Sequence, residues 1–278
     1  MSKLRSINLL VISDVHLGTY GCNAKELLFY LKSIDPKIVI LNGDIIDIWQ
    51  FKKRYWPKSH MKVIKYILKW ITQGKEIYYV TGNHDEMLRR FKGFKIEKFV
   101  IVNNLILTIN GEKVWFFHGD VFDVTMQYSK WIAKLGGVGY DFLILTNSFI
   151  NFILEKTGRN KMSFSKRIKN SVKSAIKYIN RFEKIAVEIA SSNNFKYVVC
   201  GHIHQPKIES FKTGKNTVTY LNSGDWVENL TALEYNNSKW SIYNHEPSHI
   251  EKNVINEDEK SNKELFEEMV TEFNILKK

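Results

Sequence analysis

The chain has 278 residues, of which 44% are hydrophobic and 13% aromatic, so it can form a large core and is not a predominantly disordered chain. Its 41 lysines and arginines outnumber 29 aspartates and glutamates, and the net charge of +12 favours polyanionic partners: nucleic acid, anionic lipid or phosphorylated small molecules. An evenly spread lysine bias is the alternative. Two cysteines exclude a disulfide framework, so we expect a soluble intracellular protein with reduced thiols.

Short β-branched runs alternate with helical patterns in the first half of the chain. Residues 7–13, 38–42 and 76–81 have the composition of buried strands. Between them, residues 24–33 and 60–73 have the spacing of apolar side chains that is typical of helices. Because strand, helix and strand follow one another in this order, the pattern predicts a parallel sheet with right-handed crossovers, and hence an α/β fold.

The second half of the chain changes character twice. Residues 123–193 show no strand pattern, are expected to form three helices (125–135, 140–156 and 163–192), and from 125 to 190 contain twelve basic and four acidic residues. The predicted organisation is a core of residues 1–122 and 194–246, a basic and apolar helical insert at 123–193, and an acid-rich extension at 247–278. Further strands are predicted at 99–109, 113–118, 196–200, 207–211, 217–222, 230–235 and 239–243.

No segment of the sequence has the pattern of a signal peptide or a membrane span. The first apolar run, residues 7–12, is too short for a signal sequence and lacks a cleavage site with small residues. The longest apolar stretch, residues 142–154, is interrupted by polar residues and is shorter than the roughly 20 residues that a bilayer requires. We therefore expect no part of this sequence to cross a membrane.

Side chains of the kinds that bind metal ions follow five predicted strands. Because the carboxyl ends of strands line one crevice in an open α/β sheet, these side chains are expected to converge. Carboxylate, imidazole and amide groups of this number can hold two divalent ions with one bridging carboxylate. A single fragment of this kind is usually ordinary turn chemistry, but five in succession favour a metal site. The residues are Asp14, His16, Asp44, Asn83, His84, His118, His202 and His204.

The motifs Asp14-x-His16, Gly43-Asp44-x-x-Asp47, Gly82-Asn83-His84-Asp85, His118-Gly119-Asp120 and Gly201-His202-x-His204 resemble the signature of the calcineurin-like metallophosphoesterases. The resemblance covers residues 7–244 apart from the insert. It implies a four-layer α/β/β/α sandwich with a binuclear site and a helical lid insert. It also implies two metal ions, the first bound by Asp14, His16 and His204, the second by Asn83, His118 and His202, with Asp44 as the bridge, His84 as the catalytic imidazole and Asp85 as its orienting group.

General chemistry is consistent with these implied roles. Two ions about 3.5–4 Å apart produce a hydroxide near neutral pH and neutralise charge on the phosphorus under attack. His84 is expected to protonate or stabilise the departing oxygen. Manganese is the expected metal, with iron or zinc as alternatives. Asp47 and Asp123 are expected to support the ligands, whereas His60, His245 and His249 are assigned to packing or the surface.

The insert is expected to determine the substrate. Four basic residues lie at strict i,i+4 spacing on its last predicted helix, so like charges stack at a cost of roughly 0.2–0.5 kcal/mol per pair. Either solvent tolerates this face, or a substrate phosphate or an anionic membrane surface offsets the repulsion. The apolar segment 140–154 either packs beneath that helix or forms a lid that accepts acyl chains. The basic residues are Lys169, Lys173, Lys177 and Arg181.

This combination resembles the UDP-2,3-diacylglucosamine hydrolase branch of the family, as does the segment Asn222-Ser223-Gly224-Asp225-Trp226-Val227-Glu228. The resemblance implies cleavage of the pyrophosphate of an acylated UDP-sugar in lipid A synthesis, a phosphorylated amphiphilic substrate, and a cytoplasmic enzyme peripheral to the inner membrane. The best-known members carry arginine where this chain has His84. A nuclease is the alternative enzyme, although nucleic acid suits an apolar insert poorly, and a metal-stabilised scaffold is the alternative outside catalysis.

Overall fold

The computed structural model divides into two compact units, one of residues 1–120 and 187–278 and the other of residues 121–186. The residues that it describes are 4–48, 55–126, 164–214 and 216–247, with positions 261, 264, 266–268, 270 and 271 near the C-terminus.

A seven-stranded sheet forms the first layer of strands in the larger unit. Its order is β12-β11-β1-β2-β3-β5-β4, in which β1, β2, β3 and β5 run parallel. The last four residues of β1 are all buried, as expected for a strand that is covered on both faces. The strands are β1 (Arg5–Ile12), β2 (Ile34–Asn42), β3 (Glu76–Val80), β4 (Lys95–Ile96), β5 (Phe99–Val102), β11 (Thr231–Asn236) and β12 (Lys239–Asn244).

A five-stranded sheet forms the second layer, in the order β6-β7-β8-β10-β9. Its three central strands are parallel, and its two edge strands are antiparallel to their neighbours. Edge strand β6 alternates between exposed and half-buried residues, which is typical of a strand with one face in solvent. The strands are β6 (Asn104–Ile109), β7 (Glu112–Phe117), β8 (Tyr197–Cys200), β9 (Lys207–Thr213) and β10 (Asn216–Asn222).

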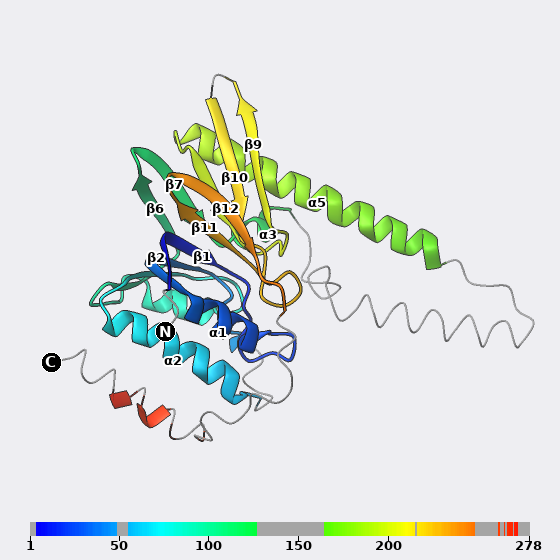
Figure 1. Ribbon diagram of the computed structural model, residues 1–278. Helices are drawn as coiled ribbons and strands as arrows, with labels where there is room; N and C mark the ends of the chain where they lie inside the picture. The colour runs from blue at the N-terminus through cyan, green and yellow to red at the C-terminus, as the bar shows by residue number, and fades with distance from the viewer. Residues whose placement is uncertain are drawn as a thin grey trace, which may run out of the picture. The chain divides into compact units, whose positions relative to one another are not determined.

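Two helices, α1 (Ala24–Ser33) and α2 (Lys58–Thr72), lie on one side of the seven-stranded sheet (Figure 1). Their apolar side chains share one buried cluster with residues of β1, β2 and β3. Helix α2 is followed by a glycine C-cap, since Gly74 has a φ of +74° and its N–H donates to the carbonyl of Ile71. A short 3-10 helix, η2 (Glu86–Phe91), follows β3.

The two sheets pack face to face through a second buried cluster. Leu9 and Ile40 of the first sheet belong to it together with Phe116, Val199 and Leu221 of the second. The C-terminal end of α5 (Phe164–Ser192) contacts the second sheet, since the hydroxyl of Ser191 donates to that of Thr213 on β9 at 2.8 Å. Two sheets flanked by helices confirm the predicted α/β/β/α layering.

The predicted strand 99–109 is two strands in different sheets. Strand β5 ends at Val102, which pairs with Val80, whereas β6 begins at Asn104, which pairs with Phe117. Asn103 lies between them, and its side-chain oxygen accepts a hydrogen bond from Thr81 at 3.2 Å. The prediction of one strand was wrong. Both strands contribute apolar side chains to the same core between the sheets, so the apolar pattern continues through Asn103, where the chain passes from one sheet to the other.

The smaller unit contains α3 (Val121–Met126) and most of α5. The rings of Phe122 and Phe182 meet edge to face, with centroids 5.3 Å apart, and the hydroxyl of Tyr178 donates to Asp123 at 2.5 Å. The helix predicted at 163–192 is confirmed. The predicted helix 140–156 and most of 125–135 lie outside the described residues. Within the described part of the chain, we find no helix whose length and apolar content would allow it to cross a bilayer.

His60 on α2 is only 2% exposed, and its Nδ1 accepts a hydrogen bond from the backbone N–H of Gly18 at 2.8 Å. Burial lowers the pKa of His60 from 6.5 to about 4. The unfolded chain therefore binds this proton near pH 6.5 and the folded chain only near pH 4, so stability is fully present above pH 6.5 and is lost as the pH falls toward 4. The difference corresponds to about 3 kcal/mol.

We therefore expect the free energy of unfolding to fall less between pH 7 and pH 4 in His60→Gln than in the unsubstituted protein, by about 3 kcal/mol. Glutamine does not titrate in this range, and its amide oxygen can still accept the bond from Gly18. Urea unfolding at a series of pH values measures this difference. Parallel curves for the two proteins would show that His60 is not a neutral buried group.

Candidate functional site

The predicted ligands lie directly after strands β1, β2, β3, β7 and β8, where the carboxyl ends of the parallel strands meet. Five of them have the left-handed backbone conformation that L-residues seldom adopt, with φ between +52° and +66°. Backbone strain of this kind concentrates at functional sites, where the surrounding structure must hold it. The five residues are Asp14, His16, Asp44, His202 and His204.

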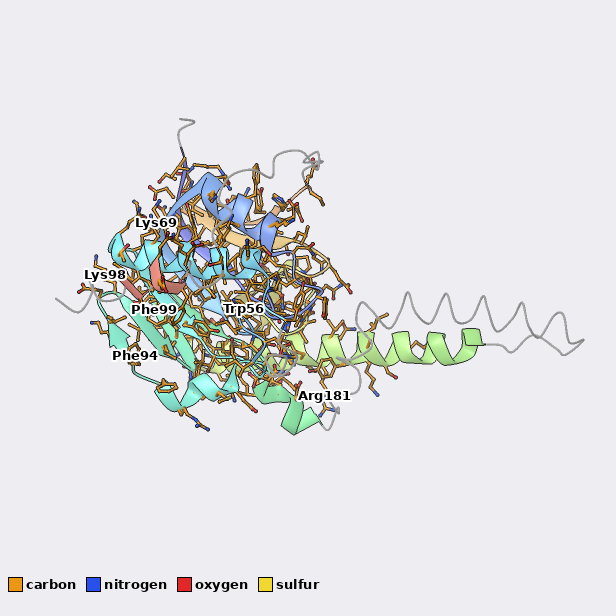
Figure 2. All side chains as sticks on the ribbon, turned by 90° about the horizontal axis from the view of Figure 1, so that it is seen from below. Trp56, Lys69, Phe94, Lys98, Phe99 and Arg181 are labelled. Atoms are coloured by element: carbon orange, nitrogen blue, oxygen red, sulfur yellow. The ribbon has the colours of Figure 1, made fainter. Side chains whose placement is uncertain are left out.

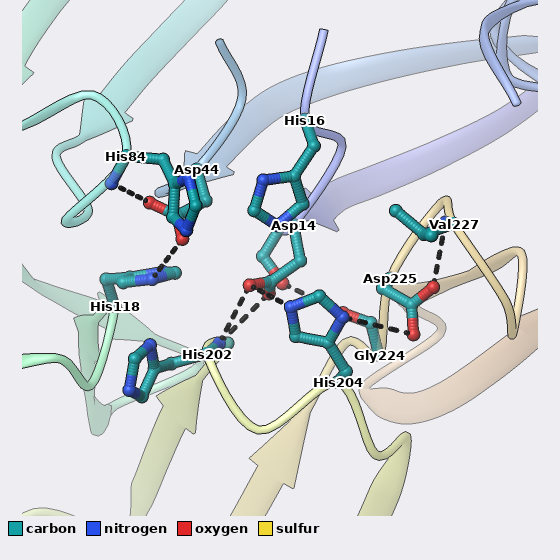
Figure 3. A network of polar contacts seen from close by, with 12 residues as sticks. Asp14, His16, Asp44, His84, His118, His202, His204, Gly224, Asp225 and Val227 are labelled. Carbon is teal, nitrogen blue, oxygen red and sulfur yellow. Dashed lines mark hydrogen bonds and ion pairs between the residues drawn. The ribbon is translucent and has the colours of Figure 1, made fainter. Parts of the chain in front are cut away.

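Asp14, His16 and His204 form the first ligand group, with one side-chain ligand atom from each residue lying within 4.8 Å of the others. Nε2 of His204 lies 3.2 Å from Oδ1 of Asp14 (Figure 3). The carboxylate of Asp14 is fully buried and also accepts the backbone N–H of His202 at 3.0 Å. These three residues are the predicted ligands of the first ion, and the fold brings them together.

Asp44, His118 and His202 form the second group, by the same criterion. Oδ2 of Asp44 lies 3.1 Å from Nε2 of His118, which is also drawn in Figure 3. Nδ1 of His118 lies 3.0 Å from the carbonyl oxygen of Asn42, so this nitrogen donates and Nε2 is left as the ligand atom. Asp44 also forms a group with His16 and His84, which places its carboxylate beside both ligand groups.

His84 lies beside Asp47, whereas Asp85 was predicted to orient it. Nδ1 of His84 is 2.9 Å from Oδ2 of Asp47, and Nδ1 of His16 is 3.7 Å from the same oxygen. The carboxylate of Asp85 instead accepts hydrogen bonds from the N–H groups of Ile45 and Gly82 and from the hydroxyl of Tyr79, at 3.0, 2.6 and 2.6 Å. The spacing Gly43-Asp44-x-x-Asp47 was the only signal in the sequence that pointed to Asp47.

The charges of the cluster depend on one another. Burial opposes ionisation of Asp14 and Asp44, but the neighbouring His204 and His118 outweigh it and lower the pKa of both carboxyl groups. Burial also opposes protonation of His118, yet Asp44 raises the pKa of its imidazole well above the ordinary value. Oppositely charged side chains therefore balance one another around the two groups. A divalent ion would replace protons on these histidines.

Two buried ligand atoms have no hydrogen-bond partner among the described residues. They are Nε2 of His16 and Oδ1 of Asn83, whereas Nε2 of His118 has the Asp44 carboxylate beside it. A buried polar atom without a partner costs about 1–3 kcal/mol, so such atoms need a reason. Each of them is a predicted metal ligand and a lone-pair donor, so the residues present fit divalent ions.

Gly43 allows His118 to approach the backbone beside Asp44. A Cβ atom on Gly43 would lie 2.3 Å from Nδ1 of His118, and its φ is +85°. Gly43→Ala is therefore expected to displace His118 and to lower the metal content of the purified protein, measured by elemental mass spectrometry. Gly93→Ala is the matched control, because Gly93 has the same φ and its Cβ would meet no atom within 4 Å.

Both substitutions introduce the left-handed strain of alanine, roughly 1–2 kcal/mol, but only Gly43→Ala adds the collision. Equal metal content in the two variants would show that the close approach of His118 to Gly43 is not required for metal binding.

Three of the four predicted basic residues of the insert have described side chains, and all three are exposed on α5. They are Lys173, Lys177 and Arg181, whereas the side chain of Lys169 lies outside the described residues. Ile176 on the same helix is 52% exposed. The residues belong to the smaller unit, so their role in substrate binding stays a prediction.

The fold and the ligand set together are those of a metal-dependent hydrolase of phosphate esters. The family model for calcineurin-like phosphoesterases matches residues 7–206, and the chain belongs to this family. It is similar to the UDP-2,3-diacylglucosamine hydrolases of Aliivibrio fischeri (strain MJ11), at 23% identity over 86% of this chain and 99% of the relative, and of Wigglesworthia glossinidia brevipalpis, at 26% over 82% and 90%.

A relative of a different description also matches. The DNA double-strand break repair protein Mre11 of Methanococcus maripaludis is 25% identical over 84% of this chain, which spans 61% of that relative. The predicted family and enzyme class are thereby confirmed, and the substrate is left open between these two kinds of relative.

Proposed function

We propose that this chain hydrolyses the pyrophosphate of UDP-2,3-diacylglucosamine to UMP and the acylated sugar 1-phosphate. The observation that carries the proposal is the pair of adjacent ligand groups with the Asp44 carboxylate beside both. Relatives named for this substrate that align over 99% and 90% of their own length support the choice of substrate. The exposed basic side chains of α5 would suit a substrate with two phosphates.

The side chains of the first group would hold one divalent ion, and those of the second group together with Asn83 would hold the other, with the Asp44 carboxylate beside both groups. Divalent ions bound there would supply the activation of water and the neutralisation of charge on phosphorus. Asp47 accepts a hydrogen bond from Nδ1–H of His84 and fixes the ring, and the imidazole in its protonated form donates its Nε2 proton to the departing oxygen. Asp85 joins the loop after β3 to the loop after β2, because its carboxylate accepts hydrogen bonds from the N–H groups of Gly82 and Ile45.

Manganese is the proposed native metal. The mixed carboxylate and imidazole ligands would also accept iron and zinc. We expect a chelator to abolish hydrolysis and manganese to restore it. Restoration by zinc or iron alone would change the metal but not the class of reaction.

The insert and the location of the protein are part of the same proposal. We place the enzyme on the cytoplasmic face of the inner membrane, where the exposed Lys173, Lys177 and Arg181 contact substrate phosphates or anionic lipid. Sedimentation with vesicles that contain anionic lipid should decrease when all three are replaced by glutamine. Unchanged sedimentation would remove the membrane from the proposal and leave the substrate.

The decisive experiment is hydrolysis of UDP-2,3-diacylglucosamine in ¹⁸O-labelled water with manganese, followed by mass spectrometry. UMP and the acylated sugar 1-phosphate are the expected products, and the label shows which phosphorus is attacked. Hydrolysis of a simple aryl phosphodiester without turnover of the UDP-sugar would keep the phosphoesterase and reject this substrate.

A nuclease is the second candidate, favoured by the match to Mre11 and by the net charge of +12. It predicts manganese-dependent cleavage of DNA, with an affinity that falls steeply as the salt concentration rises. The two candidates are separated by comparing kcat/KM for DNA and for the UDP-sugar in the same preparation.

A further inference from the structure

An exposed aromatic ring lies close to the first ligand group and has no role in the chemistry described above. Tyr20 follows His16 by four residues and is 78% exposed, the largest exposure among the large hydrophobic side chains described. Its ring stacks on that of Tyr55, with centroids 3.8 Å apart and planes inclined by 33°. One tyrosine thus supports the other, and the supported ring faces solvent.

The backbone keeps Tyr20 near the metal ligand. The N–H of Thr19 donates to the carbonyl of His16 at 3.1 Å, and the hydroxyl of Thr19 donates to the same oxygen at 2.9 Å. Such a turn brings the Cα atoms of residues 16 and 19 within about 7 Å of each other. The next Cα is about 3.8 Å further along, so Cα of Tyr20 lies within about 11 Å of Cα of His16.

The other end of the same loop is joined to the segment beside His204. Asn23 donates from its backbone N–H to the carbonyl of Trp226 at 2.9 Å and from its side chain to that of Val227 at 2.8 Å. In that second segment, the side chain of Asn229 donates to the carbonyl of His204 at 2.7 Å. The loop that carries Tyr20 is therefore held between the backbones of two ligands of the first group.

The ring beneath Tyr20 is itself in contact with its surroundings. Tyr55 meets His60 edge to face, with ring centroids 5.8 Å apart, and His60 accepts the hydrogen bond from Gly18. The indole ring of Trp56 lies against Gly18, where an added Cβ would be 3.2 Å from it. A preorganised ring loses little side-chain entropy when a ligand binds to it.

We propose that Tyr20 is a stacking platform for the nucleobase of a nucleoside 5′-phosphate whose phosphate is held at the metal centre. The inference rests on the proposed function and names the part of the chain that recognises the nucleotide. Every base has a π-face, and base–aromatic stacking is worth about 5- to 150-fold in affinity.

The surroundings of Tyr20 favour a base over a lipid surface. Its neighbours in the loop are Gly18, Thr19, Gly21, Cys22 and Asn23, which are small or polar, whereas surfaces that bind membranes present a larger contiguous apolar patch. Within the described loop from Gly18 to Asn23, Tyr20 is the one aromatic ring, and a ring of this size matches one base.

The test is calorimetric titration of the full-length, manganese-loaded protein with UMP and with ribose 5-phosphate, which lacks the base. Tyr20→Ala is expected to raise the Kd of UMP by about 5- to 20-fold and to remove most of the preference for UMP over ribose 5-phosphate. Tyr20→Phe keeps the ring and should keep the preference. Phe29→Ala is the matched control, because Phe29 is also exposed, at 53%, but lies on α1.

Three results would overturn the inference. An equal rise in the Kd of both ligands in Tyr20→Ala would show that the ring only holds the loop. An unchanged Kd of UMP would show that no base stacks there. Loss of binding to anionic vesicles with an unchanged Kd of UMP would assign the ring to a lipid surface.

The outcome can be separated from that of the proposed function. If UDP-2,3-diacylglucosamine is not hydrolysed but the preference for UMP depends on Tyr20, the nucleotide platform stands and the substrate is a different nucleotide. If the UDP-sugar is hydrolysed and the preference does not depend on Tyr20, the function stands and this inference fails.

Discussion

Replacing His84 by alanine is expected to lower kcat by about 10²- to 10⁴-fold while the metal content of the protein stays unchanged. The imidazole is the group proposed to present a proton to the departing oxygen, and alanine cannot do so. The backbone N–H of His84, which donates to Oδ1 of Asp44 at 2.8 Å, is retained in the variant. The Asp44 carboxylate should therefore keep its position.

The measurement is kcat with an aryl phosphodiester, combined with elemental analysis of the same sample. Asp47→Asn is the companion variant, because it keeps the His84 ring and removes the charge 2.9 Å from Nδ1. It should lower kcat by less than His84→Ala. Loss of metal in His84→Ala would instead make His84 a ligand, and normal kcat would remove its proposed role.

Replacing Asp44 by asparagine is expected to have the larger effect on metal binding. Its carboxylate lies beside both ligand groups, and it is 2% exposed. Asparagine removes the negative charge and one of the two oxygens, so at least one equivalent of metal should be lost. Because bound ions contribute several kcal/mol to transition-state stabilisation, kcat/KM should fall by about 10³-fold or more.

Asp35→Asn is the control for this substitution, since Asp35 is an exposed aspartate of β2 that pairs with Lys75 far from the ligands in the strand register. It should retain both metal content and activity. If Asp44→Asn keeps two equivalents of metal, the carboxylate does not bridge the two ions, and each group must bind its ion without it.

Much of the fold followed from periodicity. Residues 24–33 form a helix with the predicted bounds, and the strands at 76–81, 196–200 and 217–222 differ from the structure by one residue at an end. The pattern is reliable there because strands covered on both faces need continuous apolar runs. It failed at 99–109, where two consecutive strands belong to different sheets but face the same core.

The sequence by itself determined the chemistry of the ligands, because residue type decides which atoms can bind a cation. It also determined that the ligands converge, because the alternation of strands and helices predicts a parallel sheet whose strands end at one edge. Only the tertiary structure decided which carboxylate lies beside His84. Asp85 is the neighbour in the chain, but its oxygens accept hydrogen bonds from the N–H groups of Ile45 and Gly82. Asp47, which lies in the loop after β2, is the carboxylate that contacts the His84 ring. The stacking of Tyr20 on Tyr55 has the same origin, since contacts between distant loops leave no periodic signal in a sequence.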